Sequence, residues 1–176
     1  MNTPTSRVAS LAIALALFAT MMGFSATSAS ARVDEEMSQR QAGRVYLAAI
    51  CSSNDAAGVY SRRVFRGRNT IYLPEIRRRL PELRRASAAY SRALANTARD
   101  LFNPPAAWPA TVSNSVRSIS NKFLAESNAQ ARASAASTGI GWIDHTDRAD
   151  EIGATTNRLS RRVRALLDLP PPGRGC

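Results

Sequence analysis

Apolar and small side chains recur along most of this chain at alternating intervals of three and four residues, which is the spacing of one face of a helix. The clearest series follows Leu80 and consists of Leu83, Ser87, Tyr90, Leu94, Thr97 and Leu101. The sequence lacks runs of Val, Ile and Thr with alternating polarity, which are typical of strands. The pattern therefore predicts an all-α fold.

The first 31 residues have the three parts of a secretory signal peptide. Arg7 is the basic residue, residues 8–24 are almost wholly apolar, and Ala29-Ser30-Ala31 provides the small side chains that precede a cleavage site. We expect cleavage after Ala31, with cleavage after Ser28 as the second choice. An uncleaved anchor remains open, because the apolar run is near the shortest length that spans a bilayer.

The rest of the chain, residues 32–176, is long enough for one domain with a real core. None of its segments is apolar enough to span a bilayer. We therefore expect a secreted or cell-envelope-associated domain that has no transmembrane segment after cleavage.

Helix start signals predict two helices at the beginning of this domain. A first helix is expected from Asp34 to about Ser52, where the acidic residues 34–36 would suit its N-terminal dipole. Ser53-Asn54-Asp55 offers a cap for a second, shorter helix that ends at Arg66. The sequence thus predicts a helix break at this tripeptide.

Two prolines lie near the start of the long helix that contains the clearest apolar series. Either a helical turn begins at Pro74 and the long helix begins at Pro81, or one helix kinks there. Residues 103–105 (Asn-Pro-Pro) are expected to end it.

Two further helices are expected in the C-terminal half. Trp108-Pro109 would open one that Gly139 and Gly141 close, and the last would run from about Asp147 to Leu169. Their expected inward residues are Val112, Val116, Ile119 and Phe123, followed by Ile152, Leu159, Val163 and Leu166. Helices in series with short turns predict an antiparallel helical bundle of about four helices. Interruption of the heptads disfavours a free coiled coil.

The domain has two cysteines, Cys51 and Cys176. In an exported chain such a pair predicts a disulfide. The alternative is a buried, free Cys51 and a Cys176 that links two chains. A lipid anchor at Cys51 is disfavoured because the large Ile50 precedes it, and a two-cysteine metal site lacks nearby histidines.

Three segments carry a family resemblance: Tyr46–Asn54 (YLAAICSSN), Trp108-Pro109 and the ending Leu167–Cys176 (LDLPPPGRGC). They resemble a group of small exported actinobacterial proteins, many labelled hypothetical proteins or putative lipoproteins. The resemblance implies helices and a Cys51–Cys176 link, and it implies no function. This chain lacks the cysteine that directly follows the apolar segment in lipoprotein members, so we expect it not to be lipid-anchored.

Motifs for catalysis or cofactor binding are not evident in the sequence. His145 is the only histidine, and with Asp144 and Asp147 it falls short of a closed metal-ligand set, so we interpret this segment as a helix-entry turn. Neither a Gly-x-Ser-x-Gly elbow nor a Gly-rich phosphate loop occurs. We predict no metal and no cofactor.

A small all-helical enzyme remains an alternative, of which exported chorismate mutases are one example. Arg79 and Glu126 fall on or beside the apolar faces of their helices and are the nearest candidates for a buried catalytic pair. Such residues more often form structural ion pairs or reach the solvent.

Basic residues dominate the charge, which is +11 for the whole chain and near +10 without Arg7. Arg78, Arg85, Arg92 and Arg99 recur every seven residues, and would form a row about 30 Å long opposite the apolar face. Guanidinium groups bind phosphates well, so the row is our candidate binding site for an anionic envelope polymer or lipid surface.

The alternative is a solvated face, on which Glu75 and Glu82 pair with neighbouring arginines. Aromatic residues are not interleaved with the row and no nucleic-acid motif is present, so specific nucleic-acid binding is not expected. These residues thus favour a non-enzymatic exported domain.

Overall fold

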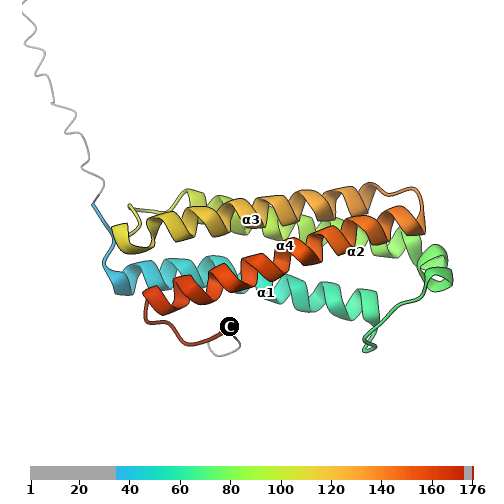
Figure 1. Ribbon diagram of the computed structural model, residues 1–176, viewed down its shortest axis with the longest axis horizontal. Helices are drawn as coiled ribbons and strands as arrows, with labels where there is room; N and C mark the ends of the chain where they lie inside the picture. The colour runs from blue at the N-terminus through green and yellow to red at the C-terminus, as the bar shows by residue number, and fades with distance from the viewer. Residues whose placement is uncertain (1–34, 173–175) are drawn as a thin grey trace, which may run out of the picture. The chain divides into compact units, whose positions relative to one another are not determined.

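The computed structural model describes residues 35–172 and Cys176, and the expected signal peptide, residues 1–31, lies outside them. Four helices follow one another: α1 (Gln39–Phe65), α2 (Leu73–Phe102), α3 (Ala110–Ala135) and α4 (Gly139–Leu166) (Figure 1). The described residues form no strand, although Glu36 and Ala107 make one isolated bridge. The all-helical fold predicted by the apolar spacing is confirmed.

The helices pack side by side, and α2 runs antiparallel to both α1 and α3. Ser91 on α2 donates to the Ser127 carbonyl on α3 at 2.9 Å. Arg84, which lies earlier on α2, donates to the carbonyl of Ser134, which lies later on α3, at 2.7 Å. Residue numbers that rise along one helix therefore fall along its neighbour, and α1 and α2 show the same relation. α4 packs against α3, which completes a four-helix bundle.

The predicted break in the first helix is wrong, because α1 runs without interruption from Gln39 to Phe65. Ser53 does not cap a new helix: its hydroxyl donates back to the Ile50 carbonyl at 2.9 Å, a bond that a helix interior allows. The helix ends where Arg66 adopts a left-handed conformation with φ of 52°.

The acidic residues 34–36 were expected to serve the first helix, but Ser38 caps α1 instead, accepting from the Gln41 amide at 3.3 Å. Glu36 reaches a different helix: its carboxylate accepts from the Ala110 amide at 2.6 Å, at the start of α3. A carboxylate there satisfies an otherwise free N–H group and complements the helix dipole.

Of the two readings of the prolines, the structure has a single helix. α2 begins at Leu73 with Pro74 in its first turn and continues through Pro81. A proline at this position removes the bond to the Arg77 carbonyl four residues earlier. Pro81 and Arg77 are both exposed, so water can satisfy that carbonyl.

The predicted boundary between the last two helices is wrong. Gly139 and Gly141 do not close a helix but lie in the first turn of α4, which Thr138 caps by accepting from the Gly141 amide at 3.1 Å. Gly139 packs closely against α2, since a Cβ there would lie only 3.2 Å from Ile76. α4 also ends earlier than expected, at Leu166, which is 37% exposed, whereas Leu167 is buried.

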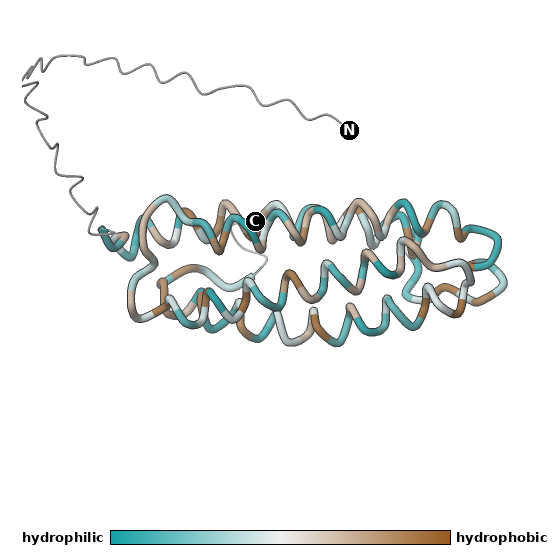
Figure 2. Tube along the Cα trace, turned by 90° about the horizontal axis from the view of Figure 1, so that it is seen from above, coloured by the Kyte–Doolittle hydropathy of each residue, from teal (hydrophilic) through white to brown (hydrophobic). Residues whose placement is uncertain are grey.

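Hydrophobic residues are interspersed with hydrophilic residues along each helix, as is typical of amphipathic helices (Figure 2). The buried apolar residues form two clusters, one containing Tyr46, Leu94 and Ile119 and the other containing Val64, Leu83 and Trp142. The predicted inward residues Val112, Val116, Ile119, Phe123 and Val163 are all buried.

Buried polar side chains are also present on the inner sides of the helices. They include Ser87 and Ser91 on α2, Glu126 and Gln130 on α3, and Thr156 on α4. Every one of these residues is less than a tenth exposed. Among the described residues, no helix is both long and apolar enough to cross a membrane.

Candidate functional site

The four arginines of the predicted row, Arg78, Arg85, Arg92 and Arg99, are all exposed on α2. We call them the arginine row. Between Pro74 and Arg99 the other exposed residues of this helix are Arg77, Pro81, Arg84, Ala89 and Asn96. The outer side of α2 over this stretch therefore carries arginines and no exposed acid.

The acids of α2 turn away from the row. Glu75 accepts from Arg68 at 2.6 Å and from Arg79 at 2.8 Å. Glu82 accepts from Arg66 at 2.8 Å and from Arg79 at 3.0 Å. Of the local pairs expected on a merely solvated face, those of Glu75 and Glu82 with Arg79 are therefore present, whereas pairs with Arg78 and Arg85 do not form among the described residues.

Within the described residues, Arg78, Arg85 and Arg92 make no ion pair, and Arg99 makes one long contact of 3.7 Å with the exposed Asp100. An exposed pair of this kind neutralises little, because solvent screens it. The row is therefore an exposed strip of uncompensated positive charge about 30 Å long.

Arg79 does not belong to the row, because it is 6% exposed and points into the junction of α1 and α2. Besides the two glutamates, it donates to the backbone carbonyls of Val64 and Arg63. The hydrogen bonds from Arg79 and Arg66 lower the pKa of Glu82 to about 2, and those from Arg68 and Arg79 lower the pKa of Glu75. Arg79 is thus a structural side chain that ties the end of α1 to α2.

Glu126, on α3, lies 6% exposed among the buried polar residues. Tyr90 donates to one carboxylate oxygen at 3.1 Å, and Thr156 lies 3.5 Å from the other. Gly153 leaves room for this carboxylate, since a Cβ there would lie 3.3 Å from it. Burial raises the pKa of Glu126 to about 7.

The structure does not bring Arg79 and Glu126 together. Glu126 bonds Tyr90, which is 11 residues from Arg79 and hence about 16 Å away along α2. They also share no hydrogen-bond partner. The paired catalytic site considered from the sequence is therefore not assembled by these two residues.

His145 does not stand in a helix-entry turn, because the α4 helix begins six residues earlier, at Gly139. Asp144 and Asp147 consequently cap nothing. The part of the chain that the structure describes holds no group of three His, Cys, Asp or Glu side chains placed to bind a metal.

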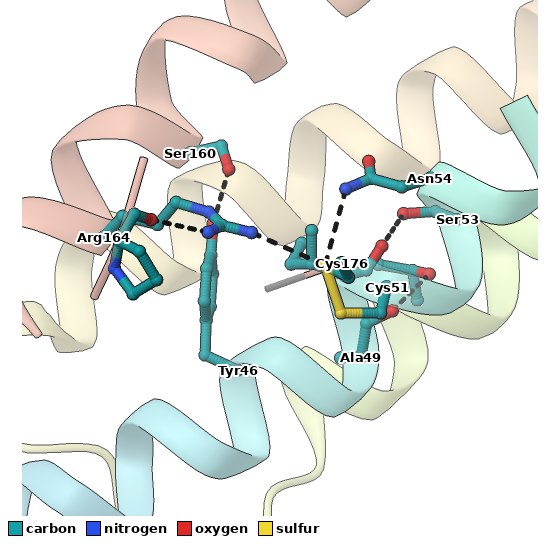
Figure 3. The surroundings of a disulfide bond; sticks show 11 residues. Tyr46, Ala49, Cys51, Ser53, Asn54, Ser160, Arg164 and Cys176 are labelled. Carbon is teal, nitrogen blue, oxygen red and sulfur yellow. Dashed lines mark hydrogen bonds between the residues drawn. A yellow bond between two sulfur atoms is a disulfide. The ribbon is translucent and has the colours of Figure 1, made fainter. Parts of the chain in front are cut away.

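The sulfurs of Cys51 and Cys176 lie at disulfide-bonding distance, with their Cα atoms 5.3 Å apart (Figure 3). Asn54 donates to Cys176 Sγ at 3.8 Å. The bond joins α1 to the far end of the chain, so the segment after α4 must fold back toward α1. Gln39 of α1 also holds that segment by donating to Asp168 at 2.8 Å.

Sequence reasoning missed three features of the interior. Arg164, near the end of α4, is only 2% exposed. The rings of Tyr60 and Tyr90 stack with centroids 5.0 Å apart. Gln130 is 1% exposed and its side-chain oxygen has no hydrogen-bond partner. The position of Gln130, one turn after Glu126, was the only one of the three with a visible sequence signal.

In comparisons with known proteins, no family model, no curated protein and no solved structure matches the chain. The function must therefore be argued from its own residues.

Proposed function

We propose that this protein is a non-enzymatic, exported helical domain that associates with anionic cell-envelope material through the arginine row. The observation that carries the proposal is the outer side of α2, where exposed arginines have no acidic partner among the described residues apart from the long contact of Arg99 with the exposed Asp100. An extracytoplasmic location agrees with the disulfide, since such bonds persist in oxidising compartments.

Geometry supports an extended rather than a compact partner. The arginines repeat about every 10 Å along α2, and a guanidinium group can bind a phosphate through two parallel hydrogen bonds. A polymer or a membrane surface offers phosphates over such a length, whereas one small anion does not. Because arginine side chains are flexible, they can bind a surface with many phosphates without requiring one fixed arrangement of those phosphates.

The direct test is binding of the domain to vesicles that contain phosphatidylglycerol and to a soluble polyphosphate, each over a range of salt concentrations. Binding should weaken steeply with salt, because each neutralised phosphate releases a counterion. The variant with Arg78, Arg85, Arg92 and Arg99 all changed to Gln should lose roughly 4 kcal/mol on the vesicles at low salt, at about 1 kcal/mol per arginine.

A matched control removes the same charge elsewhere. Arg44, Arg117, Arg132 and Arg158 are exposed on α1, α3 and α4, and changing all four to Gln should reduce binding much less. Both variants should keep the helical circular-dichroism signal, since none of the eight side chains is buried. Equal losses in the two variants would mean that net charge alone drives association, and would remove the proposed site.

A further inference from the structure

The segment after α4 folds back and forms an open hollow with that helix. The Leu169 amide donates to the Arg164 carbonyl at 2.9 Å, and the disulfide holds the segment's end on α1. The hollow has a volume of about 560 Å³ and is lined by Arg161, Arg164, Ala165, Leu169, Pro171 and Pro172. Its lining thus combines two guanidinium groups with apolar surface.

The charge of Arg164 is buried there without a counter-ion. One nitrogen donates to the Pro170 carbonyl at 2.7 Å and another to Cys176 Sγ at 3.6 Å, while Nε has no hydrogen-bond partner among the described residues (Figure 3). No carboxylate in the described part of the chain pairs with it. A buried charge without an opposite charge is costly, since neither water nor a partner stabilises it.

Arg79 shows how the same protein satisfies a buried guanidinium. It has nearly the same exposure, 6% against 2%, but it meets two carboxylates and two carbonyl oxygens. The acid closest to Arg164 in sequence, Asp168, instead accepts from Gln39. The other charged side chain of the hollow, Arg161, adds a second positive charge.

We propose that this hollow binds the anionic head of a small amphipathic molecule, a carboxylate or a phosphate carried on an apolar body. Arg164 and Arg161 bind the head, and Leu169, Pro171 and Pro172 contact the apolar part. The volume falls within the range of small-molecule sites, which are mostly apolar with a few placed polar groups. The site shares no residue with the arginine row, so the test of this site is independent of the test of the proposed function.

Calorimetric titration of the full domain with four probes tests the site. Dodecanoate and dodecyl phosphate, each below its micelle concentration, should bind one molecule per chain at 0.3 M salt, and their ranking tells carboxylate from phosphate. Dodecyltrimethylammonium, which has the opposite charge, and inorganic phosphate, which has no apolar body, should bind at least tenfold more weakly.

Two exposed neighbours provide the variant and its control. Arg161→Gln should weaken binding of the better anionic probe about tenfold, whereas Arg162→Gln, the same charge change outside the lining, should leave it unchanged. The variant with all four residues of the arginine row changed to Gln should also bind this probe normally. If Arg161→Gln has no effect, or if both single variants weaken binding equally, the site is refuted.

A second measurement does not depend on any arginine. Changing Cys51 and Cys176 both to Ser releases the end of the segment that forms one wall, with no change in charge. This variant should keep its helical signal and lose binding of dodecanoate and dodecyl phosphate at least tenfold. Unchanged binding in the released variant would show that the hollow is not the site.

Discussion

Glu126→Gln should remove most of a pH dependence from the stability of this protein. Glu126 is buried, and it has a tyrosine and a threonine near its carboxylate oxygens but no cation. Its pKa rises from 4.5 to about 7 through burial and, secondarily, through the nearby Asp150 carboxylate. The folded protein therefore holds a proton on Glu126 that the unfolded chain has already lost between these pH values.

The size of the effect follows from that difference. One pKa unit corresponds to about 1.4 kcal/mol, so ionising Glu126 inside the bundle costs on the order of 3 kcal/mol. The protein has its full stability with respect to this group below pH 4.5, and loses it as the pH rises through about 7. Glutamine is uncharged and keeps an oxygen that accepts from Tyr90, so the variant should avoid this loss.

Urea unfolding of the wild type and of the Glu126→Gln variant between pH 4.5 and 8.5 measures this difference in stability. The two should have similar free energies of unfolding at pH 4.5, and the variant should be more stable by on the order of 3 kcal/mol at pH 8.5. Glu151→Gln serves as a control, because that side chain is 67% exposed and should not change the pH profile in this range. Profiles for Glu126→Gln and wild type that run parallel would refute the reasoning.

Two more predictions concern the contacts that hold the ends of the bundle. Reduction of the disulfide should destabilise the domain by roughly 5 kcal/mol, because it closes a loop with a sequence separation of 125; an unchanged melting temperature on reduction would contradict this. Arg79→Ala should destabilise by about 3 kcal/mol, since it leaves Glu75 and Glu82 without their shared partner. Urea unfolding measures this loss, and a loss below about 0.5 kcal/mol would show that Arg79 is dispensable.

The apolar spacing predicted the fold because helix packing depends on which face is apolar, and that can be read locally. Leu83, Leu94 and Leu101 are buried on α2 as the spacing required. The outward position of the arginine row follows from the same periodicity, since residues seven apart share a face. The sequence pattern was sufficient for both.

Helix ends were harder to predict, because the same residues cap one helix and continue another. Ser53 looks like a cap, yet its hydroxyl bonds within α1 and the helix continues. Gly139 looks like a stop, yet it lies in the first turn of α4, where a Cβ would be in tight contact with Ile76 at 3.2 Å. Both outcomes depend on packing between helices, which spacing along one segment does not contain.

The environment of the buried arginines could not be read from sequence at all. Arg79 and Glu126 both fall near apolar faces, but their partners come from other turns and other helices, and the two do not meet. Arg164 donates to the Pro170 carbonyl in the segment after α4, and the disulfide that holds this segment joins residues far apart in the chain.

The exposed acidic side chains are unevenly distributed over the bundle, so its sides differ in charge. The exposed acids of α4 lie together in its first half, as Asp144, Asp147, Asp150 and Glu151, while α2 exposes arginines. The inner sides of these two helices meet, because Trp142 donates to Ser87 at 3.1 Å in the interior, so their outer sides point away from each other. An anionic surface would attract the outer side of α2 more strongly than α4, where these acids offset the exposed Arg148, Arg158, Arg161 and Arg162. Association through the arginine row would therefore be oriented, which a uniformly basic surface cannot achieve.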